Sequence, residues 1–207
     1  MTTRTHRAGA DGKRGAQGTE EAQPILHQRG REVQAYGTVR NLPIGLDAAA
    51  RKANAELLNQ ILADTITLYS MYKKHHWQVS GPTFYQLHLL FDKHADEQLA
   101  LVDLLAERVQ TLGGVATGMP ADVARISKIE NPPAGAEEVP VMISRLLEAH
   151  ELICGEVREA IDRTDENKDW GTNDLLMSDV LRTNELQVWF VSQHVVDEPL
   201  VHAGGDD

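Results

Sequence analysis

Apolar residues recur at three- and four-residue intervals in four long segments of the chain, which is the spacing of one face of an α-helix. Gly81-Pro82 separates the first two segments, the Gly- and Pro-containing connection 113–136 separates the second from the third, and Pro199 follows the fourth. The predicted helices span about 46–80, 83–112, 137–165 and 172–197, with a short helix at 121–127 inside the connection.

Three of these helices have further predicted features. Thr83 followed by Gln86 is a capping-box pattern, in which the side chain of Thr83 accepts a hydrogen bond at the start of the second helix. The apolar face of the first helix is expected to end on His76. The apolar face of the fourth helix is expected to hold Leu176, Val180, Leu186, Trp189 and Val196.

Strand-like alternation of apolar and polar residues does not compete with these patterns. The sequence therefore predicts an all-α fold, a four-helix bundle with a short helix in a long crossover between the second and third helices. Residues 1–45 have no such periodicity and are rich in Gly, Thr, Gln and Arg, which is typical of a flexible arm. We expect a mobile basic arm at 1–45, the bundle at 46–200 and a short tail at 201–207.

The charge of the chain is unevenly distributed. The formal net charge is -11, but residues 1–45 hold seven Lys and Arg against four acidic residues, which leaves about -14 for the rest. The acidic body argues against an overall nucleic-acid-binding surface. No apolar run is long enough to span a bilayer, and no apolar stretch follows the basic N-terminus as in a secretory signal. With Cys154 as the single cysteine, we expect a cytoplasmic protein without membrane partners.

The second predicted helix carries an unusual set of potential metal ligands, His88, Asp92, Asp103 and Glu107. With His88 at zero, the other three fall at about 40°, 60° and 100° around the helix, so all four share one stripe. Asp92 and Asp103 are nevertheless about 16 Å apart along the helix axis, which is too far for one metal site within one chain.

A twofold axis near residues 97–98 would resolve this distance. Two antiparallel copies of the helix would then bring His88 and Asp92 of one chain against Asp103 and Glu107 of the other, giving two identical sites per dimer. Such a mixture of imidazole and carboxylate ligands suits Fe(II). The alternative is an ordinary solvated helix face, on which such pairs are common. His76 is either a core residue or, if the first helix reaches this interface, a further ligand.

The segment that carries these residues resembles a known protein family. The run 75–114 is similar to the signature of the Dps family of miniferritins, His-Trp-x-x-x-Gly-x-x-Phe-x-x-x-His-x-x-x-Asp followed by Asp-x-x-x-Glu-Arg. The matching residues are His76, Trp77, Gly81, Phe84, His88, Asp92, Asp103, Glu107 and Arg108. Segment 187–198, which contains Trp189, looks like the C-terminal helix of the family. The resemblance covers about residues 50–198.

The resemblance implies a ferritin-like bundle that forms a hollow twelve-subunit shell from twofold dimers. It implies a ferroxidase that oxidises Fe(II), preferably with hydrogen peroxide rather than dioxygen, and stores ferric iron, which protects DNA from oxidative damage. By analogy, the di-iron site is formed by His76, His88 and Asp92 of one chain with Asp103 and Glu107 of its neighbour, and Glu107 is the expected bridge. Zinc or manganese is expected to be able to replace iron.

Several other residues have both a functional and a structural interpretation. Trp77 and Trp189 are expected near the site, as electron donors or as core residues. Asp162, Asp165, Glu166 and Asp169 are candidates for an entry pore or a solvated helix end. Ordinary ferritins instead bind iron inside one bundle through Glu-x-x-His motifs, and none of the nine histidines here has Glu three residues before it.

The basic arm raises the possibility of DNA binding. The candidate contacts are Arg4, Arg7, Lys13, Arg14, Arg29 and Arg31, and twelve arms acting together would compensate for their low number. Alternatively, segment 25–36, with His27, Glu32 and Tyr36, folds onto the shell or binds a second metal ion. Three functions therefore remain open: a ferroxidase cage, a nucleoid-compacting protein, and a structural helical dimer whose carboxylates are surface groups.

Overall fold

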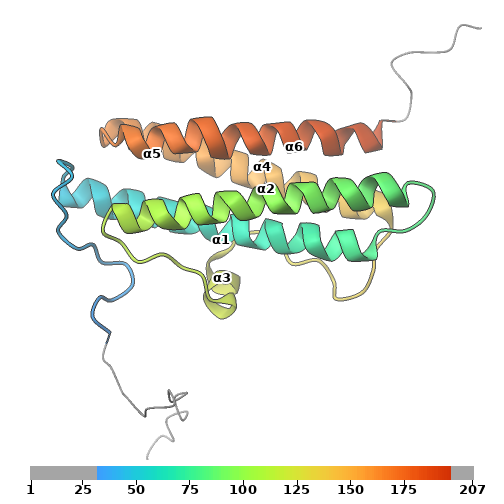
Figure 1. Cartoon of the computed structure of the whole chain (residues 1–207), viewed down its shortest axis with the longest axis horizontal. Coiled ribbons are helices and arrows are strands. Elements are labelled where there is room, and N and C mark those ends of the chain that lie inside the picture. The colour runs from blue at the N-terminus through green and yellow to red at the C-terminus, as the bar shows by residue number, and fades with distance from the viewer. Residues whose placement is uncertain (1–31, 197–207) are drawn as a thin grey trace, which may run out of the picture. The chain divides into compact units, whose positions relative to one another are not determined.

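A computed structural model describes residues 32–196, and the unit that contains the helices begins at Gln34. Every regular element in this described part is helical (Figure 1). The elements are α1 (Ala48–Gln78), α2 (Phe84–Thr111), α3 (Pro120–Ile126), α4 (Val139–Glu166), α5 (Trp170–Leu175), the π-helical η1 (Leu176–Leu181), α6 (Arg182–Ser192) and the 3₁₀ turn η2 (Gln193–Val195). The elements from α5 to α6 follow one another without a break and form the fourth long helix.

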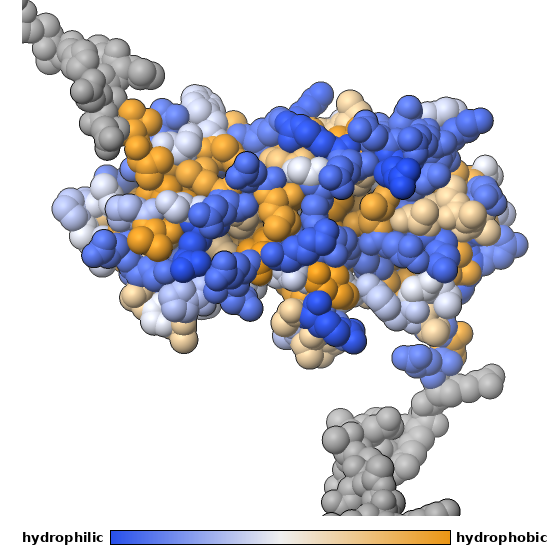
Figure 2. All heavy atoms as spheres, turned by 180° about the vertical axis from the view of Figure 1, so that it is seen from behind, coloured by the Kyte–Doolittle hydropathy of each residue, from blue (hydrophilic) through white to orange (hydrophobic). Residues whose placement is uncertain are grey.

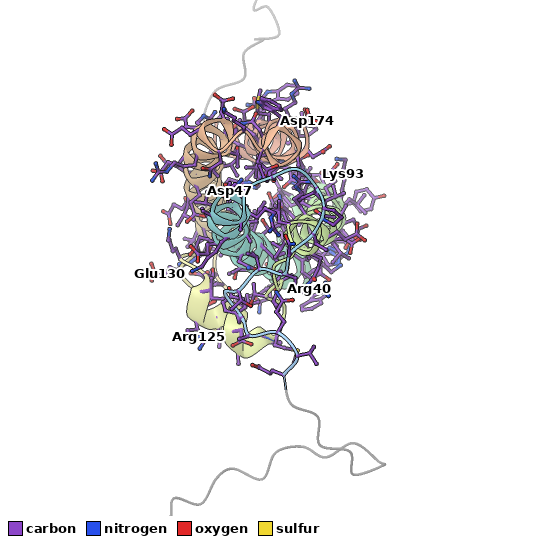
Figure 3. The ribbon with its side chains drawn as sticks, turned by 90° about the vertical axis from the view of Figure 1, so that its left-hand side faces the viewer. Arg40, Asp47, Lys93, Arg125, Glu130 and Asp174 are labelled. Atoms are coloured by element: carbon purple, nitrogen blue, oxygen red, sulfur yellow. The ribbon has the colours of Figure 1, made fainter. Side chains whose placement is uncertain are left out.

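The four long helices surround a common apolar core, which confirms the predicted bundle. Helix α1 packs along α2 and also against α4, and α4 packs against α6. In the end-on view of Figure 3 the long helices surround one centre, and α3 lies outside them. The largest fully buried apolar side chains come from α1, α2, α4 and the segment after α2, and include Leu58, Leu62, Leu87, Phe91, Leu105, Leu112, Met142 and Leu146. None of the helices in the described residues is both long and apolar enough to cross a membrane.

The start of α2 was predicted correctly, but the capping box was not. Thr83 is the residue before the helix, yet its side chain makes no capping hydrogen bond. Its backbone has φ -97° and ψ 11°, whereas a capping side chain needs an extended backbone to reach back to the helix amides. The turn is instead closed by the amide of Phe84, which donates to the carbonyl of Gly81, a residue whose φ of 95° favours glycine.

The buried face of the fourth helix differs from the predicted one. Leu176 and Val180 are buried as expected, but Leu186, Trp189 and Val196 are 47%, 60% and 51% exposed. The buried stripe continues instead through Asn184, Gln187 and Val191. These positions follow Val180 at helical spacing. The spacing therefore identifies the buried face of the fourth helix, whereas the hydrophobicity of the residues does not.

The end of α1 also differs by one position. His75, rather than His76, belongs to the buried stripe, with no exposed surface. His76 lies one residue further around the helix and is only partly buried. The prediction that His76 ends the apolar face is therefore wrong, and His76 instead contacts His88 on α2.

Candidate functional site

Three of the expected metal ligands lie together where α1 ends and α2 begins. His76 comes from the last turn of α1, and His88 and Asp92 lie one turn apart on α2. The two imidazole rings stack with centroids 3.8 Å apart and an angle of 18° between their planes. The Nε2 atom of His76 is 3.8 Å from a carboxylate oxygen of Asp92. We refer to His76, His88 and Asp92 as the half-site.

Each histidine of the half-site is oriented by the main chain of the other. His76 donates from Nδ1 to the carbonyl of His88 at 2.7 Å, and His88 donates from Nδ1 to the carbonyl of His76 at 2.9 Å. Since a carbonyl oxygen can only accept, both Nδ1 atoms must carry the proton. In the neutral form of each ring, Nε2 then has the lone pair, which is how metal-binding histidines are commonly oriented.

Lys73 completes the surroundings of the half-site and was missed by the sequence analysis. Its ammonium forms a hydrogen-bonded ion pair with Asp92. This hydrogen bond lowers the pKa of the Asp92 carboxyl and raises the pKa of the Lys73 amine. The position of Lys73 beside the half-site could have been predicted, because residues three apart on a helix are neighbours and Lys73 precedes His76 by three.

Asp103 and Glu107, the other two expected ligands, do not join this cluster. Both lie further along α2 and both are exposed. Among the residues that the structure describes, no group of three or more His, Cys, Asp or Glu side chains within one chain, the half-site included, is arranged to hold a metal ion by itself. The chain therefore brings three of the five predicted ligands together and leaves two carboxylates on the exposed side of the same helix.

The two candidate electron donors are surface residues of the subunit. Trp77 is 71% and Trp189 is 60% exposed, so the alternative that they pack in the core of the bundle is wrong. Trp77 directly follows His76 in the sequence, and Trp189 packs edge-on against Phe190 with ring centroids 5.1 Å apart.

The acidic stretch at the end of α4 divides into exposed and buried residues. Asp162, Asp165 and Glu166 are exposed, which leaves both readings of them open. Asp169 is 3% exposed and accepts hydrogen bonds from the side chains of Asn54, Arg108 and Thr172. These contacts lower the pKa of its carboxyl against the opposing effect of burial. The pore prediction is therefore wrong for Asp169, which joins helices within the subunit.

The predicted DNA contacts lie outside the described residues. This applies to Arg4, Arg7, Lys13, Arg14, Arg29 and Arg31, and also to His27. Of the residues considered for a second metal ion, Glu32 and Tyr36 are described, and Tyr36 is 51% exposed.

The interior of the bundle holds a chain of polar side chains that the sequence analysis also missed. Tyr72 contacts His150 and His94, and His150 contacts Asn184. Two glutamines, Gln98 and Gln187, extend this chain toward Glu97. All of these except Glu97 are at most 1% exposed. Each was hidden in the sequence because a polar residue on a helix gives no sign of a buried partner on another helix.

Comparison with known proteins identifies the class to which this fold and half-site belong. Residues 55–201 match the ferritin-like domain family. The structure of DpsC from Streptomyces coelicolor is 60% identical, with a TM-score of 0.81, and the match covers 83% of this chain and 100% of that one.

Two further relatives lead to the same conclusion. Dps from Thermosynechococcus elongatus is 32% identical with a TM-score of 0.69, and the match covers 74% of this chain and 98% of that one. The DNA protection during starvation protein of Agrobacterium fabrum is 30% identical over 166 residues, which are 80% of this chain and 99% of the relative. The chain belongs to the Dps family of miniferritins within the ferritin-like proteins.

Proposed function

We propose that this protein oxidises Fe(II) at sites shared between two copies of the chain and stores the ferric product in a hollow twelve-subunit shell. Each site combines the half-site of one chain with Asp103 and Glu107 of the partner. The observation that carries the proposal is the half-site itself, in which two stacked histidines donate from Nδ1 to backbone carbonyls, which leaves their Nε2 atoms for a metal, and Nε2 of His76 lies near a carboxylate. Protection of DNA follows from the removal of Fe(II) and peroxide in the cytoplasm.

The ligands suit Fe(II) as a substrate. Two imidazoles and three carboxylates form the mixed nitrogen and oxygen set that iron accepts, and the carboxylates offset the added charge of the ferric ion. Glu107 of the partner is the expected bridge between two irons. Two Fe(II) ions give one electron each to hydrogen peroxide, which takes up two protons and leaves as two waters. No hydroxyl radical is released in this balance, whereas iron in solution transfers electrons singly. Zinc and manganese also bind such ligands.

The outer face of α2 supports a twofold interface. Leu89, Leu99 and Leu104 are 49%, 48% and 41% exposed and lie on the same helix as Asp103 and Glu107. Apolar residues also reach the surface on the opposite side of the bundle, which is the side that Figure 2 shows. Large exposed apolar residues beside a carboxylate stripe are expected of a surface that another subunit covers.

Subunit complementation tests the shared site directly. One variant carries His88→Ala with Asp92→Asn, and the other carries Asp103→Asn with Glu107→Gln. Each is expected to assemble alone but to lose rapid peroxide-dependent Fe(II) oxidation. In a 1:1 co-assembly, half of the twofold dimers are mixed and each mixed dimer regains one of its two sites, so about one quarter of the wild-type rate should return.

Two results would contradict this proposal. A site built within one chain gives no recovery on mixing, and a carboxylate stripe without function leaves both variants as active as the wild type. Asp122→Asn, which changes an exposed carboxylate on α3, is the control for the loss of charge and should leave oxidation unchanged. Mass measurement by light scattering on each assembly separates lost chemistry from lost assembly.

DNA binding by the arm is a second candidate function. It is favoured by the name of a relative in Nostoc, a nutrient stress-induced DNA-binding protein that is 31% identical over 153 residues. The test is salt-dependent DNA retardation by the full chain and by a chain without residues 1–45. Binding that depends on the arm and weakens steeply with salt supports it, and equal retardation by both chains contradicts it.

A further inference from the structure

Tyr72 is a fully buried tyrosine that lies between His94 and His150 in the polar chain inside the bundle. Its side chain has no exposed surface, while Tyr36 and Tyr85 are 51% and 70% exposed and Tyr69 is partly buried. The Tyr72 hydroxyl lies 2.6 Å from Nε2 of His150 and 3.2 Å from Nδ1 of His94. Burial raises the pKa of this phenol well above its usual range, so the hydroxyl stays protonated at physiological pH.

The direction of each hydrogen bond in this chain follows from Asn184. Its amide nitrogen donates to the carbonyl of Val180 at 2.7 Å, which leaves its oxygen as the acceptor for Nδ1 of His150 at 2.8 Å and for the amide of Gln98 at 3.2 Å. Nδ1 of His150 therefore carries the proton, and its Nε2 accepts from the Tyr72 hydroxyl. The Tyr72 oxygen is left to accept from His94.

His150 is held as a neutral base in this arrangement. Desolvation by burial lowers its pKa to about 4, so Nε2 is unprotonated at neutral pH. The same cause lowers the pKa of His94 to about 4. A buried phenol hydrogen-bonded to a free imidazole at 2.6 Å is an arrangement in which the loss of an electron from the ring can be accompanied by the loss of its proton.

Tyr72 also lies close to the half-site. It precedes His76 by one turn on α1, a rise of about 6 Å along the helix. Its ring lies 6.0 Å, centroid to centroid, from that of Phe91, which directly precedes Asp92. The buried phenol and the half-site are thus joined along one turn of α1 and through one aromatic side chain of α2.

We propose that Tyr72 is a redox partner of the iron site, supplying one electron to hydrogen peroxide when only one Fe(II) is bound, while its phenolic proton moves to Nε2 of His150. This inference rests on the proposed ferroxidase function. Peroxide needs two electrons: one comes from Fe(II), which becomes Fe(III), and one from Tyr72, which becomes a neutral phenoxyl radical. Peroxide takes two protons from solvent and leaves as two waters, and His150 keeps the proton of Tyr72 as an imidazolium.

The burial of Tyr72 explains what such a step achieves. A site with a single Fe(II) would otherwise reduce peroxide by one electron and release hydroxyl radical. The second electron from Tyr72 completes the reduction, and the radical that results is enclosed by the bundle, away from solvent. A further Fe(II) can then reduce it, with return of the proton from His150.

Electron paramagnetic resonance on the assembled protein tests this step. The assembly is loaded with one Fe(II) per site, mixed with peroxide and frozen within milliseconds. A tyrosyl signal is expected, and growth with ring-deuterated tyrosine should narrow it, which separates it from a radical on Trp77 or Trp189. A variant with Tyr36, Tyr69 and Tyr85 all changed to Phe leaves Tyr72 as the only tyrosine and should keep the signal, whereas Tyr72→Phe should lose it.

Histidine variants separate a redox role from a structural one. His150→Gln keeps a hydrogen-bond acceptor for Tyr72 but removes the base, so the yield of the radical should fall several-fold. His94→Gln, which changes a similarly buried neighbour, should keep it. If both variants lower the yield equally, the proton transfer to His150 is wrong.

The remaining outcomes are also distinct. Iron oxidised without a tyrosyl signal, or a signal lost in the triple variant, overturns the role of Tyr72 and leaves the proposed ferroxidase intact. If Fe(II) is not oxidised at all, the proposed function is wrong and the role of Tyr72 falls with it. If Tyr72→Phe fails to assemble, the triple variant still tests the proposal, because any tyrosyl signal in it must come from Tyr72.

Discussion

At the scale of single residues, Lys73 bears directly on one ligand of the proposed site. Its ammonium is paired with Asp92, the carboxylate that binds iron in the proposed site. The side chains of Lys73 and Asp92 are 24% and 41% exposed, so solvent screens the pair and its free energy is small, about 1 kcal/mol or less. In the proposed site, Fe(II) therefore competes with the ammonium of Lys73, whose interaction with Asp92 is weak.

Replacing this lysine should strengthen the binding of metal. Lys73→Gln removes the competing charge, and the affinity for Fe(II) should rise by up to roughly fivefold, corresponding to about 1 kcal/mol. Anaerobic calorimetric titration measures the change. Lys74→Gln is the matched control, because Lys74 bonds to Gln78 and to the carbonyl of Gly135, away from Asp92. Weaker binding in Lys73→Gln would show that the lysine supports the site.

At the scale of helices, the residues that precede α2 and α5 have different roles. Thr83 precedes α2 without capping it, whereas Asp169 precedes α5 and accepts from the amide of Thr172 at 3.1 Å. Asp169 also accepts from Asn54 on α1 and forms an ion pair with Arg108 on α2. One buried carboxylate thus joins the start of the fourth helix to the first two.

The two positions should respond very differently to substitution. Thr83→Ala is expected to change the free energy of unfolding by less than about 0.5 kcal/mol, because its side chain makes no capping bond. Asp169→Ala should cost about 3 kcal/mol or more, because it breaks a buried ion pair and leaves donors unpaired. Urea unfolding followed by circular dichroism measures both. Similar losses for the two variants would contradict this account.

The helices could be predicted from local features of the sequence, but the contacts between their buried side chains could not. Glycines, prolines and apolar spacing predicted all four long helices and the short α3 to within a few residues. His88 and Asp92 could be paired because both lie on one helix at known spacing. The bond between His150 and Asn184 joins residues on separate helices, and nothing near either residue indicates the other. The same holds for Trp189, whose exposure depends on which face of the fourth helix meets α4.

At the scale of the whole molecule, the buried histidines should make the bundle sensitive to acid. Burial lowers the pKa of His75, His94 and His150 to about 4 from an ordinary 6.5. Between these values the unfolded chain binds more protons than the folded one, so the free energy of unfolding falls as the pH drops from 6.5 toward 4. Each histidine contributes up to about 3 kcal/mol to this loss.

The carboxyl of Glu156 changes the free energy of unfolding with pH in the opposite direction, which allows the effect of the histidines to be checked. Burial raises the pKa of Glu156 to about 7, so its contribution is present at low pH and is lost as the pH rises from about 4.5 to 7. Urea unfolding at pH 7 and pH 5 should show a clear loss of stability at pH 5, and Glu156→Gln should enlarge that loss. Equal stability at both pH values would show that the histidines are not held neutral.

The division of the ligands between copies also bears on how the protein is made. On the proposed arrangement, a newly synthesised subunit brings together only two imidazoles and one carboxylate, which is paired with an ammonium, while its Asp103 and Glu107 lie apart from them. Such a subunit is expected to bind Fe(II) weakly, so oxidation of Fe(II) would begin only after a second copy has bound. The same dimer contact would complete the iron site and begin the assembly of the shell, so Fe(II) would be oxidised only where the ferric product can be stored.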